Sequence, residues 1–336
     1  MKNLLYLLLL VLIIAGIYFL SQNSTGSSLT EKGLTDFAIE DTSSIGKVII
    51  DDGRNIAELK RGDDRFWILD DKYIAMPHHV DVIMKTFANV GIQNPVSKAK
   101  KAEVIKIIMG DTRKVAIYDR EGKWMKTWYV GRATQTSQGT YALLETPEEG
   151  LSSEPFVIEM RGFRGYLTTR FHAIINEWRW TGLFYYPELD FKRVVVETPR
   201  DPAQGFSVEV RSKLDADFTL FDHTGLPVDK AKSVVAAYLG GYSKINVEHF
   251  EPEVTPAQED SIRATPPAFR ISVTGKDDKV QQADIWYRPT PLATRSRMGD
   301  RAPEHDPERV YVYFNDDMAM GQRLTFDKIL LTIQDL

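Results

Sequence analysis

The sequence predicts an α+β protein, in which an N-terminal transmembrane helix precedes two tandem, internally repeated, mostly antiparallel sheet units, each with a packed helix. An uncharged apolar run opens the chain, and strand-like segments alternate apolar with polar residues, a period typical of half-buried strands. The order of strands, helix and strand in residues 45–96 recurs in residues 191–250. The predicted parts are an anchor (1–20), a flexible linker (21–32), a first unit (33–160), a bridge (161–190) and a second unit (191–336).

The uncharged run begins at Leu4, ends at Leu20 and follows Lys2. As a helix it would be about 25 Å long, which approaches the thickness of a bilayer core. A cleaved signal peptide usually has a shorter apolar run of about 7–15 residues, so an uncleaved anchor is favoured over a cleaved signal. Lys2 favours a cytoplasmic N-terminus, which places the body of the protein outside the cytoplasm.

The repeat is based on helix spacing, because four apolar residues in each half lie at i, i+3, i+4 and i+7, on one face of a helix. They are Val80, Ile83, Met84 and Phe87 in the first half, and Ala231, Val234, Val235 and Tyr238 in the second. Farther along the chain, Ile117 is matched with Ile271, and Trp128 with Trp286. We therefore expect two copies of one module.

Local signals mark the connections between the predicted elements. Asp52-Gly53 and Glu121-Gly122 predict tight hairpins, and Thr255 followed by Gln258 predicts a capping box at a helix start. Residues 169–178 are expected to contain a short helix. Residues 288–309 contain four prolines and five arginines without apolar periodicity, which predicts a long loop.

Composition limits the classes of function. The formal net charge is -5 and no basic stripe with interleaved aromatic residues occurs, so we expect no nucleic-acid partner. The chain has no cysteine, which excludes thiolate metal sites and cysteine nucleophiles. His78 and His79 are adjacent and His305 lies beside two carboxylates, but a metal site needs three or four convergent ligands. No nucleophile elbow, P-loop or dinucleotide fingerprint occurs, so we expect no metal, no cofactor and no catalytic residues.

The bridge combines the residue types that are enriched at interface hot spots. The predicted partner-binding residues are Arg161, Phe163, Arg164, Tyr166, Arg170 and Trp178. An alternative is that this segment clamps the two units together. A second alternative is a hydrolase, or a module that binds glycans or small ligands, with a cleft between the units lined by Tyr129, Tyr141, Trp178 and Tyr287.

Six segments of the chain carry a resemblance to a known family. They read KTWYVG, GTYALLE, PFVIEMRGFRGYLTTRF, EWR, LF and FKRVVVETPRDPAQGFSV. With them the chain resembles the uncharacterised bacterial "domain of unknown function 4340" family, found beside gliding-type ABC transporter components. The resemblance implies a protein of the bacterial inner membrane whose C-terminal body lies in the periplasm, auxiliary to a transporter or envelope complex. We therefore expect a non-catalytic binding or scaffold subunit with a protein partner in the membrane.

Overall fold

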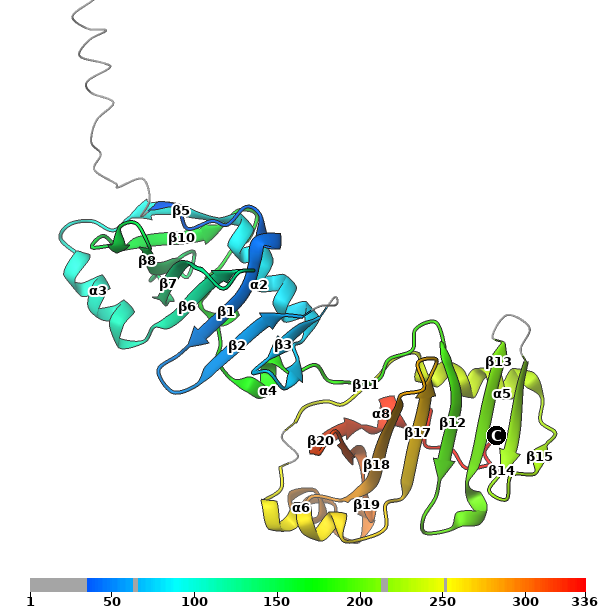
Figure 1. The fold of residues 1–336 in the computed structure, drawn as a ribbon. Helices are drawn as coiled ribbons and strands as arrows, with labels where there is room; N and C mark the ends of the chain where they lie inside the picture. Colours follow the sequence, from blue (N-terminus) through cyan, green and yellow to red (C-terminus); the bar gives the residue numbers. More distant parts are fainter. Residues whose placement is uncertain (1–34, 63–65, 213–216, 251–252) are drawn as a thin grey trace, which may run out of the picture. The chain divides into compact units, whose positions relative to one another are not determined.

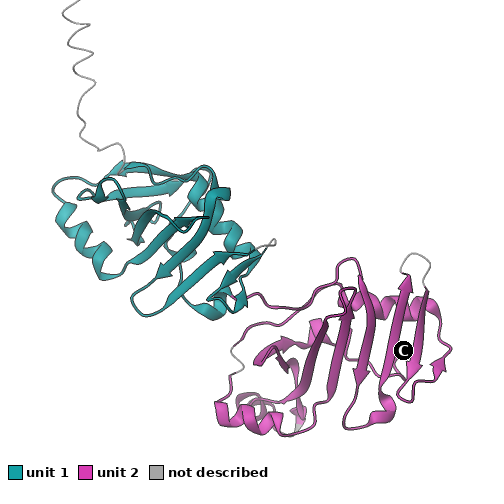
Figure 2. Cartoon of the chain, viewed as in Figure 1, with its two compact units in different colours: residues 1–178 teal, residues 179–336 magenta. Residues whose placement is uncertain are grey.

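The computed structural model describes residues 35–62, 66–212, 217–250 and 253–336. The chain divides into two compact units, residues 1–178 and 179–336 (Figure 2), and this boundary falls inside the predicted bridge. The predicted anchor and linker, residues 1–32, lie outside the described residues. Within the described ranges, no helix is long and apolar enough to cross a membrane.

The fold is α+β with two large antiparallel sheets, one in each unit (Figure 1). In unit 1 the described strands form a ten-stranded sheet in the order β4-β3-β2-β1-β6-β7-β8-β10-β5, with β9 beside β8. The strands are β1 (Ile45–Asp51), β2 (Ile56–Arg61), β3 (Trp67–Leu69), β4 (Tyr73–Ile74), β5 (Val90–Pro95), β6 (Arg113–Asp119), β7 (Trp124–Ala133), β8 (Thr140–Thr146), β9 (Gly150–Leu151) and β10 (Phe156–Met160).

The hairpins of unit 1 confirm the turn predictions. Asp52 Oδ1 accepts hydrogen bonds from the backbone N–H groups of Arg54 and Asn55, at 2.9 and 2.8 Å, and Gly53 has φ +80°. Gly122 has φ +81° between β6 and β7. A positive φ is strained for side chains with a Cβ, so glycine suits both turns.

Two helices cover opposite faces of the unit 1 sheet. Helix α2 (Pro77–Asn89) buries Val80, Ile83 and Phe87 in the main core, as its spacing predicts. Helix α3 (Lys101–Gly110) packs Val104 and Ile108 on Leu143 in a satellite cluster. Because successive side chains of a strand point to opposite faces, Leu143 faces α3 while its neighbours in β8 face the main core.

The remaining elements of unit 1 are short. They are η2 (Thr42–Ser44), η3 (Thr168–Arg170) and α4 (Ile175–Trp178). The expected single helix in residues 169–178 is therefore two separate turns. Leu167, Phe171 and Ala173, which adjoin these turns, are buried in the main core, whereas Ile174 is 43% exposed.

Unit 2 contains an eight-stranded sheet in the order β15-β14-β13-β12-β17-β18-β19-β20, and a separate pair, β11 with β16. The strands are β11 (Gly182–Phe184), β12 (Phe191–Glu197), β13 (Phe206–Ser212), β14 (Asp217–Asp222), β15 (Pro227–Val228), β16 (Ile245–Asn246), β17 (Phe269–Gly275), β18 (Val280–Pro289), β19 (His305–Phe314) and β20 (Asp317–Gln322). The helices are η4 (Pro202–Gln204), α5 (Lys232–Gly240), η5 (Gly241–Ser243), α6 (Pro256–Arg263), α7 (Leu292–Met298), η6 (Gly299–Arg301) and α8 (Arg323–Phe326).

Helix α5 packs on the main core of unit 2 with a different set of residues from the predicted one. Ala231 is the N-cap and Val234 is 38% exposed, so the predicted face is wrong in its first half. The buried face consists of Val235, Tyr238 and Leu239 of α5, and Tyr242 of the adjoining η5 continues it. These residues also follow the i, i+3, i+4, i+7 spacing, four residues later, and the sequence alone does not choose between the two sets.

The predicted capping box of α6 is confirmed. Thr255 Oγ1 accepts from the N–H of Gln258, and the Gln258 side chain accepts from the N–H of Thr255. Ile262 of this helix packs on a satellite cluster that contains Trp286, Tyr311 and Met320.

Seven strands follow the same order in the two large sheets. In unit 1 they are β1, β2, β3, β4, β6, β7 and β8, and their counterparts in unit 2 are β12, β13, β14, β15, β17, β18 and β19. A bulge also recurs at one position. In β1 the pairing with β6 shifts between Ile45 and Lys47, and in β12 the pairing with β17 shifts between Phe191 and Arg193. In each large sheet a helix follows the first four strands, α2 in unit 1 and α5 in unit 2. A second helix directly precedes the fifth shared strand, α3 before β6 and α6 before β17.

These pairings correct the predicted match of individual residues. The shared bulge makes Asp119 equivalent to Gly275, so the residue equivalent to Ile271 is Val115 and not Ile117. Trp128 lies opposite Val115 on the neighbouring strand, and the corresponding strand pair of unit 2 places Ala283 opposite Ile271. The residue equivalent to Trp128 is therefore Ala283, not Trp286. Trp128 belongs to the main core of its unit, whereas Trp286 belongs to a satellite cluster.

The expected long loop at residues 288–309 is also corrected. Strand β18 continues to Pro289 and β19 begins at His305, so both ends belong to the sheet. Helix α7 and the turn η6 occupy the part between them. Strand β20 was not predicted, because its sequence DMAMGQ has none of the β-branched and aromatic residues typical of strands.

Candidate interaction surfaces

Residues 161–166, here called the bridge turn, leave the end of β10 in unit 1. The N–H of Arg161 donates to the carbonyl of Asn89 at 3.3 Å, and the N–H of Phe163 donates to the carbonyl of Met160 at 3.0 Å. Gly162 and Gly165 have φ +77° and +137°, a backbone conformation that side chains with a Cβ rarely adopt. The turn therefore has a defined backbone, attached to the last residue of α2.

Four predicted contact residues of the bridge turn face solvent. Phe163 is 38% exposed and Tyr166 is 39% exposed, and Arg161 and Arg164 are also exposed. Among the described side chains, none forms an ion pair with either arginine. Two aromatic rings and two unpaired guanidinium groups thus lie within six consecutive residues.

The other two predicted contact residues support this turn or the core. Arg170 is half-buried, donates from Nη1 to Thr86 Oγ1 at 2.8 Å, and places its guanidinium carbon 4.3 Å from the ring centroid of Phe163. Burial lowers the pKa of Arg170 from its ordinary value. Trp178 is fully buried and donates from Nε1 to the carbonyl of His172 at 2.7 Å, so it presents no surface to a partner.

The predicted cleft residues pack in separate clusters within their own units. Tyr129 and Tyr141 pack on the satellite cluster under α3, and the hydroxyl of Tyr129 donates to Glu145 Oε2 at 2.8 Å. Burial and this carboxylate raise the pKa of Tyr129 to about 12. Tyr287 packs on the main core of unit 2, and Trp178 belongs to the main core of unit 1.

A pocket of about 420 Å³ in unit 2 contains none of the predicted site residues. Its charged groups include Asp222 and Arg270, which already have partners. Asp222 Oδ1 accepts from the N–H groups of Thr224 and Leu226, both at 2.9 Å, and Arg270 makes two hydrogen bonds to Asp284, at 2.7 and 2.8 Å. These groups hold a turn and a strand pair together.

Sequence reasoning missed a cluster of two histidines and a tryptophan in unit 1. The ring of His79 lies 5.7 Å from that of His172, and the ring of Trp178 lies 4.9 Å from His172 and 5.7 Å from His79. His172 Nδ1 lies 3.3 Å from Glu177 Oε2. The described residues contain no group of three or more histidine, cysteine or carboxylate side chains placed to hold a metal ion. Because His79 and His172 are 93 positions apart in the sequence, no local pattern predicts their contact.

Burial lowers the pKa of both histidines. The charge of His78 lowers the pKa of His79 further, and the backbone and carboxylate of Glu177 oppose this effect. For His172, the carboxylate of Glu177 raises the pKa and His79 lowers it, without reversing the effect of burial. The cluster therefore favours neutral imidazoles.

Comparison with known proteins does not identify a function for these residues. The chain matches no family model, and neither a curated protein nor a solved structure matches it. The resemblance to the family described above remains a prediction from its motif residues. The proposals below are based on the residues of this chain.

Proposed function

We propose that this protein is a single-pass membrane-anchored, extracytoplasmic, non-catalytic binding or scaffold subunit, auxiliary to a gliding-type ABC transporter or another envelope complex. The observation that carries the proposal is the exposure of the bridge turn. Phe163 and Tyr166 present aromatic surface beside the guanidinium groups of Arg161 and Arg164, neither of which pairs with a described carboxylate. Tyrosine and arginine are among the residues enriched at binding hot spots.

The backbone of the turn supports a role in binding, because it is fixed before a partner arrives. Binding costs free energy when it immobilises flexible side chains and loops. The hydrogen bonds of Arg161 and Phe163, and the contact of Arg170 with the Phe163 ring, limit the motion that a partner would have to remove. We therefore place the main protein contact of unit 1 on these residues.

We further infer that the two units arose by duplication of one module. The shared strand order, the bulge shared by β1 and β12, and the paired positions of α2 with α5 and α3 with α6 all support this inference. A bulge is usually retained within a family as a designed feature, so its recurrence is informative. On this proposal, the membrane anchor precedes the first copy.

Site-specific photo-crosslinking tests the proposed contact. A photo-reactive residue replaces Tyr166 in the full-length protein in native membranes, and a control probe replaces Ile56, which is 58% exposed on β2. We expect position 166 to give one discrete protein adduct that position 56 does not give. The adduct should disappear in the double variant Arg161→Glu, Arg164→Glu. Equal labelling from both positions, or an adduct unchanged by charge reversal, would contradict the proposal.

A further inference from the structure

The connection between β18 and β19, residues 290–304 and here called the arm, is much longer than its counterpart in unit 1. The corresponding strands β7 and β8 are joined by six residues, 134–139, whereas the arm has fifteen. Since the two sheets otherwise share this strand order, the arm is an addition to unit 2 that the sheet itself does not need. Extra segments of this kind are usually functional or disordered.

The base of the arm is closed by hydrogen bonds between its two ends. Pro289 pairs with His305 in the sheet, the N–H of Thr290 donates to the carbonyl of Glu304 at 3.2 Å, and Thr290 Oγ1 donates to the carbonyl of Pro303 at 2.5 Å. The two ends of the arm therefore leave the sheet side by side.

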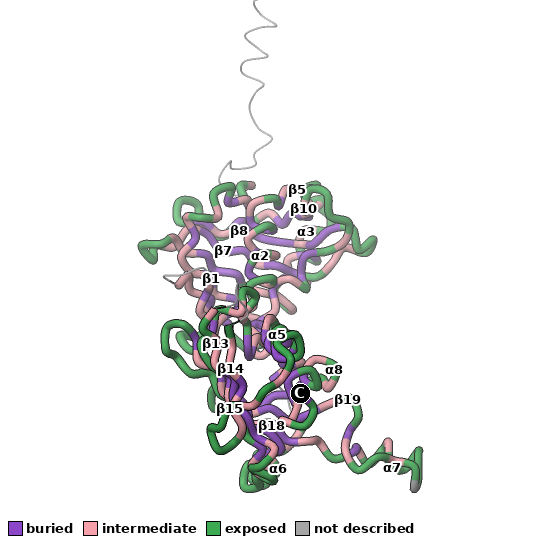
Figure 3. Tube along the Cα trace, turned by 90° about the vertical axis from the view of Figure 1, so that its right-hand side faces the viewer, coloured by how far each residue is buried: buried purple, intermediate pink, exposed green. Residues whose placement is uncertain are grey.

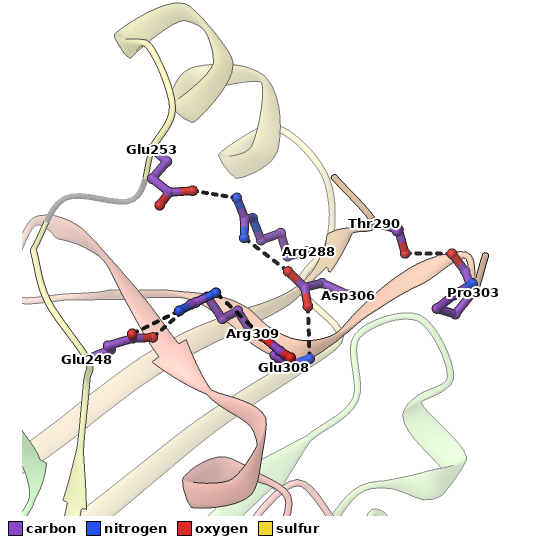
Figure 4. Close-up of polar contacts among 8 residues, drawn as sticks. All are labelled: Glu248, Glu253, Arg288, Thr290, Pro303, Asp306, Glu308 and Arg309. Carbon is purple, nitrogen blue, oxygen red and sulfur yellow. Dashed lines mark hydrogen bonds and ion pairs between the residues drawn. The ribbon is translucent and has the colours of Figure 1, made fainter. Parts of the chain in front are cut away.

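A buried ion pair lies directly beneath this base (Figure 4). Arg288 Nη1 lies 3.0 Å from Asp306 Oδ2, and the two side chains are only 11% and 7% exposed. Arg288 Nη2 also lies 2.6 Å from Glu253 Oε2, and Asp306 Oδ1 accepts from the N–H of Glu308 at 2.8 Å. Buried charges are tolerated only with close partners, so these contacts fix the orientation of the base.

Beyond this base the arm lies in solvent. Helix α7 stands apart from the body of unit 2 in Figure 3, and every residue from Leu292 to Gly299 except Thr294 is exposed. Leu292 is 81% exposed and Met298 is 40% exposed. A helix of seven residues has little stability by itself, because helix nucleation is costly and packing usually supplies the stability. A fixed base that carries exposed apolar side chains is suited to docking.

The exposed arginines of the arm favour a partner that carries carboxylate groups. Arg295, Arg297 and Arg301 are exposed, and none of them forms an ion pair with a described side chain; Arg295 donates only to the carbonyl of Glu304, at 3.1 Å. Guanidinium groups recognise carboxylates through paired hydrogen bonds. Two separated apolar side chains offer little area for insertion into lipid, which takes a longer amphipathic face.

We propose that the arm docks into a carboxylate-rich surface of a partner protein, with Leu292 entering an apolar pocket of that surface. The inference shares with the proposed function only the premise that the protein is a binding subunit. It uses a different surface, on unit 2 instead of unit 1, so each surface can be tested while the other is intact.

The test places a photo-reactive residue at position 292 of the full-length protein in native membranes, and identifies the crosslinked peptide by mass spectrometry. We expect a peptide of another protein with several Asp or Glu residues near the attachment point. The triple variant Arg295→Glu, Arg297→Glu, Arg301→Glu should lower the yield by about tenfold or more, since charge reversal at an interface opposes both encounter and binding. The yield should also fall as salt screens the charges.

Controls separate this inference from misfolding and from failure of the proposed function. A probe at Leu226, which is 64% exposed on the turn between β14 and β15, should give no such adduct. The triple variant should keep the melting temperature of the wild type, because the three arginines are exposed and form no ion pair with a described side chain. Adducts only with lipid, with nucleic acid or with this chain itself, or a yield unaffected by the triple variant, would overturn the inference. The adduct from position 166 should persist in the triple variant.

Discussion

The imidazole of His172 stacks on the indole of Trp178, with ring centroids 4.9 Å apart and planes inclined by 26°. The indole Nε1 donates to the carbonyl of His172, so the two residues are held by a ring contact and a hydrogen bond. His79 meets both rings edge-on from the start of α2. The last residue of unit 1 is thereby fixed by two histidines with lowered pKa values.

This cluster makes the stability of unit 1 depend on pH. Both histidines bind a proton more weakly in the folded state than in the unfolded state, where the ordinary pKa is 6.5. Below pH 6.5 the unfolded state binds more protons, so the free energy of unfolding decreases as pH falls toward the folded-state pKa values. We expect the double variant His79→Gln, His172→Gln to flatten the melting temperature between pH 7 and 5. The exposed-histidine variant His223→Gln should retain the slope of the wild type.

The side chain of Lys126 in β7 donates hydrogen bonds to the first described residues of unit 1. It is 8% exposed, and its Nζ donates to the carbonyls of Asp36 at 2.7 Å and Ala38 at 3.0 Å. Lys126→Met should destabilise unit 1 by about 1–3 kcal/mol, because it removes a charged donor from two partly buried hydrogen bonds. Hydrogen exchange should accelerate at residues 36–39. Lys123→Met, in the turn of the same hairpin, is the matched control, and equal effects from both variants would contradict this role.

The ion pair beneath the arm gives a prediction about stability. Asp306→Ala should lower the free energy of unfolding by about 3–5 kcal/mol, because it removes one of the carboxylates that pair with the buried guanidinium of Arg288. The double variant Arg288→Met, Asp306→Leu should lower the free energy of unfolding by less than Asp306→Ala does, because it leaves no buried charge unpaired. Arg309, 34% exposed and paired with Glu248 at 2.9 Å, provides the comparison, and Arg309→Met should change the free energy of unfolding by about 0–1 kcal/mol. Chemical denaturation measures all three, and a double variant less stable than Asp306→Ala would exclude this explanation.

Substitution of two predicted contact residues should change the stability of unit 1 to very different extents. Trp178→Ala should destabilise unit 1 by about 3–5 kcal/mol, because it empties a fully buried site. Tyr166→Ala should change stability by no more than about 0.5 kcal/mol, as expected for a surface position. Thermal unfolding of the two variants measures the difference. A large loss of stability in Tyr166→Ala would show that its ring belongs to the core.

Local chemistry explains which parts of the fold could be predicted from sequence. The Asp52-Gly53 hairpin and the Thr255 to Gln258 capping box each depend on residues within four positions of one another, and both are confirmed. The face of α2 was also predicted, since apolar residues at only one phase of that helix make a continuous stripe. Two overlapping stripes run through α5 and the adjoining η5, and only the packing of Tyr242 of η5 against the core selects the later one.

The features that sequence reasoning missed depend on distant contacts. His79 and His172 meet through tertiary packing, and Arg288 gains its role from Asp306 and Glu253, which lie on other segments. Trp178 has the same residue type as an interface hot spot and was predicted to be one. Its burial in the main core decides otherwise, and residue type alone does not distinguish the two environments.

The central claim is that the exposed rings of the bridge turn bind a protein partner. Affinity purification of the full-length protein from gently solubilised membranes tests it, with the wild type compared with Phe163→Ser, Tyr166→Ser. Tyr185→Ser, at a 47% exposed tyrosine of unit 2, is the matched control. We expect one partner to co-purify with the wild type and the control but not with the double variant. Recovery of a monomeric wild type without a stable partner, or equal recovery of the partner with the double variant, would contradict the claim.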